Sequence, residues 1–150
     1  MKAVVAGGDS RQISVYNGLT AVKAIAKGND DIILIHDAAR PLISSKIISD
    51  NIKACVKFDA VDTVIKASDT IIRSVDEKVI SDIPNRSELY QGQTPQTFKL
   101  SLILEAHEKA KSGLVPNVTD DAKLVLSLGK KVHLVEGSKQ NFMMRLVLRA

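Results

Sequence analysis

Short apolar runs alternate with amphipathic segments over the first half of the chain. Three runs rich in Val, Ile and Ala predict buried strands, and they span residues 2–8, 31–37 and 59–67. Between them lie two segments with apolar side chains at helical spacing. One covers residues 14–28, with Ser14 as a candidate N-cap, and the other begins near Ser44 or Ser45. This order predicts a mainly parallel sheet with right-handed crossovers.

The pattern changes after residue 68. Two β-prone stretches, residues 70–75 and 78–83, flank the sequence DEK and predict a hairpin that projects from the sheet. Pro84 and Pro95 exclude long helices in this region. The remaining expected elements are helices at residues 99–113 and 119–129 and a strand at residues 130–137. Because the chain opens in a strand and its sheet would have poorly covered edges, the pattern resembles the later part of a larger domain.

Composition narrows the class of protein. The 150 residues are 45% hydrophobic but only 3% aromatic, which suits one domain with a core of Ile, Val, Leu and Ala. The net charge is +4, yet Lys and Arg are scattered and Trp is absent. A nucleic-acid partner is therefore not expected, because a stacking platform is missing, whereas a small phosphorylated substrate fits the mild positive charge.

Cysteine and histidine usage point away from disulfides and zinc. Cys55 is the single cysteine and is expected to be a small buried hydrophobe. The three histidines show no metal-ligand spacing, and no apolar run approaches the length needed to span a membrane. A cytoplasmic protein without a membrane partner is the prediction from these features.

The stretch ILIHDAARPLIS, residues 33–44, carries the strongest chemical signal. Asp37 ends an expected strand, where open α/β sheets bind ligands, and a few carboxylates together with substrate phosphates suit Mg²⁺. Ala38 and Ala39 leave room for a bulky ligand, and Arg40 can donate to a phosphate. From the residue types alone, an alternative stands open in which Asp37 caps the next segment and pairs with Arg40.

Five stretches in order carry a family resemblance: GGDSRQISVYNGL, LIHDAARP, NRSELYQGQTPQTF, VTDDA and VEGSKQN. Together they resemble the polyol-phosphate cytidylyltransferases, which act on 2-C-methyl-D-erythritol 4-phosphate or ribitol 5-phosphate. The resemblance implies an α/β Rossmann-like nucleotidyltransferase fold, a three-layer sandwich that is incomplete here, with a projecting β-arm at about residues 70–90. It also implies CTP and a polyol phosphate as substrates, Mg²⁺ as cofactor, and a place in isoprenoid or teichoic acid biosynthesis.

The resemblance assigns roles to individual positions. The nucleotide would contact Gly8, Asp9, Ser14, Ala38, Ala39 and Arg40. Asp37 would hold Mg²⁺ at the triphosphate. The polyol-phosphate side would comprise Thr70, Arg86, Thr94, Thr119 and Asp120, with Arg86 reaching over from a partner subunit. Purely structural roles stay open for some of these residues. Gly8 could be a turn glycine, Ser14 and Thr119 helix caps, and Arg86 a surface charge.

Two departures from the family pattern matter. The glycine-rich loop that wraps the triphosphate in the family does not precede Met1, and the stretch after VEGSKQN reads FMMRLVLRA. Met143 stands where the family has Lys, and Arg145 where it has Thr. These departures motivate a second hypothesis, a catalytically impaired remnant that retains the fold and its dimer contact. The polyol stays open, with a slight preference for ribitol 5-phosphate.

The expected arm also predicts an assembly. Ile71, Val79 and Ile83 would be poorly buried on the arm of a monomer. Packing against a twin arm would cover them, so an isologous homodimer is expected.

Overall fold

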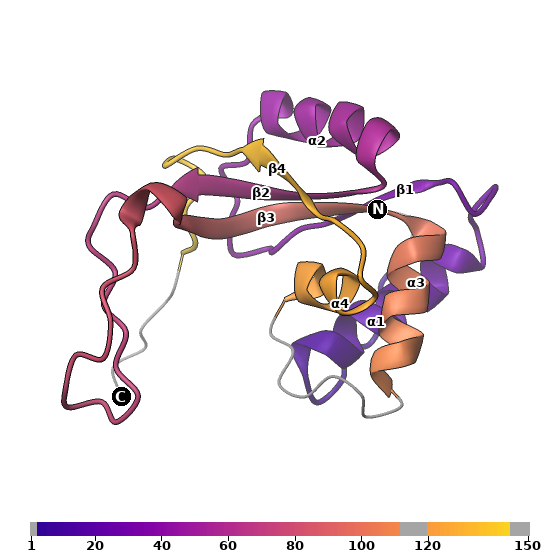
Figure 1. The fold of residues 1–150 in the computed structure, drawn as a ribbon. Helices are drawn as coiled ribbons and strands as arrows, with labels where there is room; N and C mark the ends of the chain where they lie inside the picture. The colour runs from indigo at the N-terminus through magenta and orange to yellow at the C-terminus, as the bar shows by residue number, and fades with distance from the viewer. Residues whose placement is uncertain (1–2, 112–119, 145–150) are drawn as a thin grey trace, which may run out of the picture.

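The computed structural model describes residues 3–111 and 120–144, which form a sheet between two helical layers. The order is α1 (Arg11–Lys23), β1 (Ile32–Ile35), α2 (Ser45–Phe58), β2 (Ala60–Lys66), the 3₁₀ turn η1 (Arg86–Glu88), β3 (Tyr90–Lys99), α3 (Leu100–Lys109), α4 (Asp121–Ser127) and β4 (His133–Glu136). Helix α2 covers one face of the sheet, and α1, α3 and α4 lie on the other (Figure 1). The expected three-layer α/β architecture is therefore present.

The sheet order is β1-β3-β2-β4, which corrects the expectation of mainly parallel pairing. Strands β2 and β4 pair in parallel, but β3 lies antiparallel between β1 and β2. The sequence pattern did not predict β3, because YQGQTPQTFK is polar and contains Pro95, which is disfavoured in a central strand. The register shifts between Asp62 and Val64, opposite the proline, so the ladder is locally irregular there.

The predicted first strand is also wrong for the residues described. Residues 3–8 form no strand, and the four-stranded sheet of the described residues does not include them. Helix α1 begins at Arg11, and its N-cap is Ser10, whose Oγ accepts from the Ile13 N–H at 3.2 Å. Ser14 therefore lies inside the helix instead of capping it.

The second helix matches the expectation more closely. Ser44 caps α2, and its Oγ accepts from the Ile47 N–H at 3.3 Å. The helix ends at Asp59, a residue with left-handed backbone conformation at φ 63°. The chain then enters β2 directly, so the α2–β2 turn is tight.

The segment from about residue 70 to residue 83 projects from the sheet as an arm (Figure 1). It is not the regular hairpin that the pattern predicts, because its strands are reduced to one bridge between Arg73 and Asp82. The tip turns around Asp76, whose Oδ1 accepts from the Lys78 and Val79 N–H groups at 3.0 and 2.9 Å. Local hydrogen bonds hold the tip, and among the described residues no helix or strand of the three layers covers the arm.

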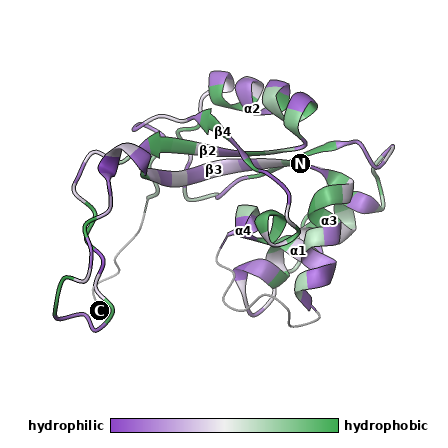
Figure 2. Ribbon diagram, in the orientation of Figure 1, coloured by the Kyte–Doolittle hydropathy of each residue, from purple (hydrophilic) through white to green (hydrophobic). Residues whose placement is uncertain are grey.

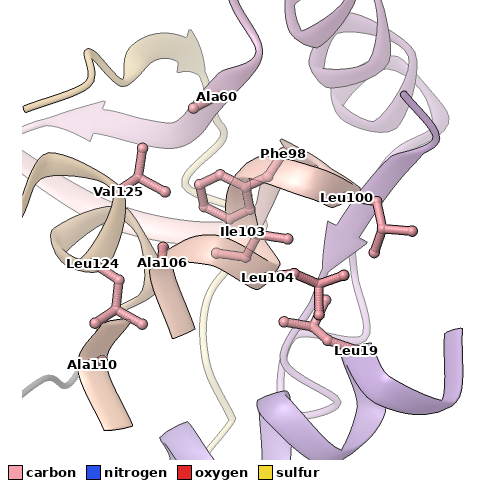
Figure 3. Packing of buried hydrophobic residues seen from close by; sticks show 10 residues of the cluster. All are labelled: Leu19, Ala60, Phe98, Leu100, Ile103, Leu104, Ala106, Ala110, Leu124 and Val125. Carbon is pink, nitrogen blue, oxygen red and sulfur yellow. The ribbon is translucent and has the colours of Figure 1, made fainter. Parts of the chain in front are cut away.

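The main core lies between the sheet and the layer of α1, α3 and α4 (Figure 3). Phe98 from β3 packs there against aliphatic side chains of α3 and α4, among them Ile103 and Leu124. A smaller cluster under α2 contains Cys55, Val61 and Val135. Cys55 is buried, as predicted, and burial raises the pKa of its thiol to about 11.

Candidate active site

The loop after β1 places Asp37 at the end of the sheet. The Asp37 N–H donates to Thr94 Oγ1 at 3.0 Å, and the same hydroxyl lies 3.0 Å from His36 Nδ1. The Arg40 N–H donates to the Asp37 carbonyl at 2.9 Å, which closes the turn. Strand β3, which carries Thr94, therefore fixes the loop that carries Asp37.

The carboxylate of Asp37 does not cap the following helix, because Ser44 has that role. Its Oδ2 lies 3.6 Å from Arg40 Nε, so the pairing that the alternative interpretation requires is present but long. The Asp37 side chain is about one quarter exposed. A carboxylate in this position remains available to a ligand.

Arg40 is held by the segment that follows β4. Its Nη1 donates to the Asn141 carbonyl at 2.8 Å, and the Met144 N–H donates to the Ala39 carbonyl at 2.7 Å. The Arg40 side chain is 12% exposed, and its buried Nε finds no hydrogen-bond partner among the described residues. An unpaired buried donor is costly unless a ligand satisfies it.

A cavity of about 220 Å³ brings these groups together. Its lining residues are Arg11, Asp37, Arg40, Gly92, Gln93, Thr94, Gln96, Asp120 and Met143. Four of the residues that the family resemblance singles out, Asp37, Arg40, Thr94 and Asp120, thus share one cavity although they are far apart in sequence. Ala38 and Ala39 lie on the same loop as Asp37.

Sequence reasoning missed four lining residues, Arg11, Gly92, Gln93 and Gln96. Arg11 lies within the stretch GGDSRQISVYNGL, but only its neighbours were singled out. Gln96 lies on β3, the strand that the hydrophobic pattern did not predict. A polar strand with buried Gln and Thr side chains is the signal that could have found it, because buried polar groups need partners.

Asp120 has two functions in this geometry. Its Oδ1 caps α4 by accepting from the Ala122 and Lys123 N–H groups at 2.8 and 3.3 Å. Its Oδ2 accepts from Gln96 Nε2 at 2.9 Å, and Gln96 Nε2 also donates to Asp62 Oδ1 at 3.1 Å. One amide therefore joins a cavity carboxylate to a second carboxylate behind it.

The carboxyl of Asp62, behind the cavity, has a pKa well above its ordinary value. Burial raises the pKa of its carboxyl to about 7, and the nearby charge of Asp120 adds to the shift, although the hydrogen bond from Gln96 opposes it. The carboxyl lies close to Gly92 and is hydrogen-bonded to Gln96, two residues that line the cavity.

Gly8, Asp9 and Ser14 lie together at the start of α1. The Gly8 N–H donates to Ser14 Oγ at 3.0 Å, and the Ser14 hydroxyl donates to the Ser10 carbonyl at 2.9 Å. A Cβ on Gly8 would collide with the Ile13 side chain, so this position requires glycine for a close approach. None of the three lines the cavity of Asp37.

The predicted polyol-phosphate residues are only partly brought together. Thr94 and Asp120 line the cavity, but Thr70 and Arg86 lie exposed on the arm and its base and do not line it. Arg86 Nη1 donates to the Ser68 carbonyl at 3.2 Å. Thr119 and Arg145 lie outside the described residues. A role for Arg86 in a partner's site stays a prediction.

The cavity fits a hard cation only with help from a substrate. Within residues 3–111 and 120–144 no group of three or more His, Cys, Asp or Glu side chains could hold a metal. Mg²⁺, however, is bound in many phosphate sites by one or two carboxylates and the substrate phosphates. The Asp37 carboxylate, exposed to the cavity and weakly paired, suits such a site. In the same described ranges, no helix is both long and apolar enough to cross a membrane.

An open α/β sheet with a mixed-charge cavity at the end of a strand is the arrangement in which this class of fold binds ligands. The family model of IspD: 2-C-methyl-D-erythritol 4-phosphate cytidylyltransferase matches residues 2–146. The chain belongs to this family.

A curated relative and two solved structures are similar over most of the chain. The ribitol-5-phosphate cytidylyltransferase of Lactiplantibacillus plantarum is 40% identical over 140 residues, 93% of this chain and 60% of that protein. The 2-C-methyl-D-erythritol 4-phosphate cytidylyltransferase of Thermus thermophilus has a TM-score of 0.81 at 32% identity, covering 95% of this chain and 66% of that one. The enzyme of Francisella tularensis has a TM-score of 0.83 at 30% identity, with 93% and 64% covered.

These relatives bear out the fold and family predicted from the five motifs. The chain spans about 60 to 66% of the lengths of these three relatives. It therefore shares a large part of their fold, including the sheet that carries the Asp37 cavity.

Proposed function

We propose that the protein transfers a cytidylyl group from CTP to a polyol phosphate, giving a CDP-polyol and pyrophosphate. The observation that carries this proposal is the convergence of Asp37, Arg40, Thr94 and Asp120 on one cavity. These residues come from the motifs that the family shares. Among the relatives compared above, the ribitol-5-phosphate cytidylyltransferase has the highest identity, which favours ribitol 5-phosphate as the acceptor. The polyol would decide between teichoic acid and isoprenoid biosynthesis.

The reaction is one in-line displacement. A phosphate oxygen of the polyol phosphate attacks the α-phosphorus of CTP, the bond to the bridging oxygen breaks, and pyrophosphate leaves with that oxygen. Positioning and charge stabilisation are sufficient for such a step, so a nucleophilic side chain is not needed. Arg40, which lines the cavity, would donate to a phosphate oxygen, and the Thr94 hydroxyl would keep the Asp37 loop in place.

Mg²⁺ is part of the proposal. Asp37 would hold it, and the ion would offset the charge of the triphosphate. Asp120 would accept hydrogen bonds from polyol hydroxyls, because it lines the cavity and its Oδ2 has the Gln96 amide as its described partner. A cytoplasmic location stays a prediction.

Met143 supports the second candidate, an impaired remnant. It lines the cavity at the position where the family pattern has Lys, so a cation that would face the phosphates is replaced by a thioether. Calorimetry with CTP and Mg²⁺ separates the two candidates, and a dissociation constant in the low micromolar range would rule the remnant out.

The arm would form the dimer contact, as the family resemblance implies. Its apolar side chains are exposed in the single chain, among them Ile71, Val79 and Ile83. Figure 2 shows hydrophobic segments along the arm, which has no layer beneath it. A second copy would cover them and would bring Thr70 and Arg86 toward the partner's cavity.

The decisive experiment measures pyrophosphate release from CTP with ribitol 5-phosphate or 2-C-methyl-D-erythritol 4-phosphate. We expect Asp37→Asn to lower turnover at least about 100-fold, on the order of 3 kcal/mol, because the charge that would hold Mg²⁺ is lost. Its melting temperature should stay close to that of the unsubstituted protein. Asp30→Asn, at a side chain 95% exposed, is the matched control and should keep full turnover. Full turnover of Asp37→Asn at saturating Mg²⁺ would end the metal-ligand proposal.

A further inference from the structure

A buried chain of charged contacts runs from α3 through α4 to α1 and ends at the candidate cavity. His107 Nε2 lies 2.9 Å from Asp121 Oδ1, and Arg11 Nη1 lies 2.8 Å from Asp121 Oδ2. The Asp121 N–H donates to Gln96 Oε1 at 3.3 Å. None of the roles assigned above uses this chain of contacts.

Burial makes the arrangement costly to build. The side chains of His107 and Asp121 are each 1% exposed. Removing a carboxylate from water costs several kcal/mol, and well-packed apolar residues often stabilise such a position as well as an ion pair does. The main core packs tightly beside these residues with Leu104, Ala106 and Ala122 buried nearby in the same helices. The charged chain therefore calls for an explanation other than stability.

Arg11 suggests such an explanation, because it is the residue of this chain of contacts that lines the candidate cavity. Its side chain is 36% exposed and lines the cavity with Asp37, Arg40 and Asp120. A guanidinium has five N–H donors in a fixed plane, and the contact with Asp121 uses one end of that plane. The rest of the group can meet a ligand. Arg40 lines the same cavity, so two guanidinium groups line one small space.

We propose that Arg11 is an anion-binding residue of this cavity, that Asp121 positions its guanidinium, and that His107 holds Asp121. Arg11 and Arg40 together bind phosphate oxygens of the bound substrate. This inference deepens the proposed function and rests on it for the identity of the substrate. The competing explanation is a purely structural tie between the start of α1 and the start of α4.

The test measures affinity by calorimetry on the intact chain, with inorganic pyrophosphate and with CTP, each with Mg²⁺. Arg11→Gln should weaken both ligands about tenfold or more, since a charged hydrogen bond is lost, and Arg11→Lys should fall in between. Arg73→Gln removes the same charge on the exposed arm and should leave both affinities unchanged. Melting temperatures report whether each variant is folded.

The positioning roles need variants that separate geometry from stability. His107→Gln can still donate to Asp121 and should bind pyrophosphate like the unsubstituted protein, whereas His107→Leu should weaken binding several-fold. Asp121→Asn should weaken it to a similar degree. The rescue by Gln but not by Leu would not arise from packing alone.

Each outcome bears on a different claim. If Arg11→Gln binds pyrophosphate as tightly as Arg73→Gln does, or if the unsubstituted chain binds neither ligand, the inference is overturned. If His107→Leu and Asp121→Asn lower only the melting temperature, the positioning role is overturned and the structural tie remains. If pyrophosphate affinity depends on Arg11 but no CDP-polyol forms, the inference stands and the proposed function fails.

Discussion

At the scale of single residues, the side-chain amide of Gln96 bridges two carboxylates, Asp62 and Asp120, next to the cavity. It donates to both Asp62 and Asp120, at 3.1 and 2.9 Å. Asp120 also accepts from two backbone N–H groups as the cap of α4. Burial raises the pKa of the Asp62 carboxyl to about 7.

The raised pKa of Asp62 predicts a pH-dependent stability. The folded pKa of Asp62, about 7, lies above the ordinary value of 3.8, so the folded state holds the proton more tightly than the unfolded state. Its contribution to stability is present below about pH 4 and is lost as the pH rises toward 7. Asp62→Asn removes this loss while keeping the acceptor for Gln96. Its stability relative to the unsubstituted protein should rise by about 2 kcal/mol between about pH 4.5 and 8, allowing for partial exposure.

Urea unfolding at the two pH values measures this effect. Asp30→Asn, at an exposed carboxylate, serves as the control and should show no comparable trend. An advantage of Asp62→Asn that does not change with pH would contradict the assignment of this titration to Asp62.

At the scale of elements, α2 is joined to the sheet by a buried polar network as well as by apolar packing. Asn51 Nδ2 donates to the Ile47 carbonyl and to Thr63 Oγ1, both at 2.9 Å, and Asn51 Oδ1 accepts from Thr97 Oγ1 at 3.2 Å. Thr63 Oγ1 in turn donates to the Pro95 carbonyl at 2.7 Å. One side chain thus contacts α2, β2 and β3 at the place where the ladder is irregular.

Asn51→Ala should therefore destabilise the fold by about 2 to 3 kcal/mol, because it leaves buried polar partners unpaired. The free energy of unfolding from urea titration is the measurement. Lys53→Ala, on the exposed side of the same helix, should cost less than about 0.5 kcal/mol. Equal small effects for both variants would show that the network adds little.

At the scale of the whole molecule, the arm is a part of the described chain whose apolar side chains stay exposed. Val79 is 65% exposed at its tip, and Ile80 beside it is 55% exposed. Elsewhere the surface also carries single apolar side chains, such as Val56 at 63%, so exposure alone is not diagnostic. The arm differs because its apolar side chains lie on a segment that projects away from the three layers (Figure 2).

A matched pair of variants tests the dimer. Light scattering at micromolar concentration should give the mass of two chains for the unsubstituted protein and for Val56→Asp. Val79→Asp should shift the mass toward one chain, because an unpaired charge would be buried in the contact. A monomeric unsubstituted protein would refute the arm-mediated dimer, and equal behaviour of the two variants would place the contact elsewhere.

The sequence alone was sufficient for the elements whose signals are local. A serine cap of α2 at Ser44 or Ser45, the apolar runs of β1, β2 and β4, and the motif around Asp37 could all be recognised, because caps and periodicity depend on neighbouring residues. The five ordered motifs also determined the family. They did not determine Ser10 as the cap of α1, since several hydroxyl residues lie within reach of that helix start.

Only the tertiary structure decided how the polar segments are used. Strand β3 is polar and contains Pro95, so its place at the centre of the sheet depends on partners from α2 and β2 that are distant in sequence. The run at residues 3–8 forms no strand, because strand formation needs a neighbour that local pattern cannot supply. Arg11 and Asp121 meet for the same reason: a contact across 110 positions of chain is decided by how helices pack, which propensity and periodicity do not contain.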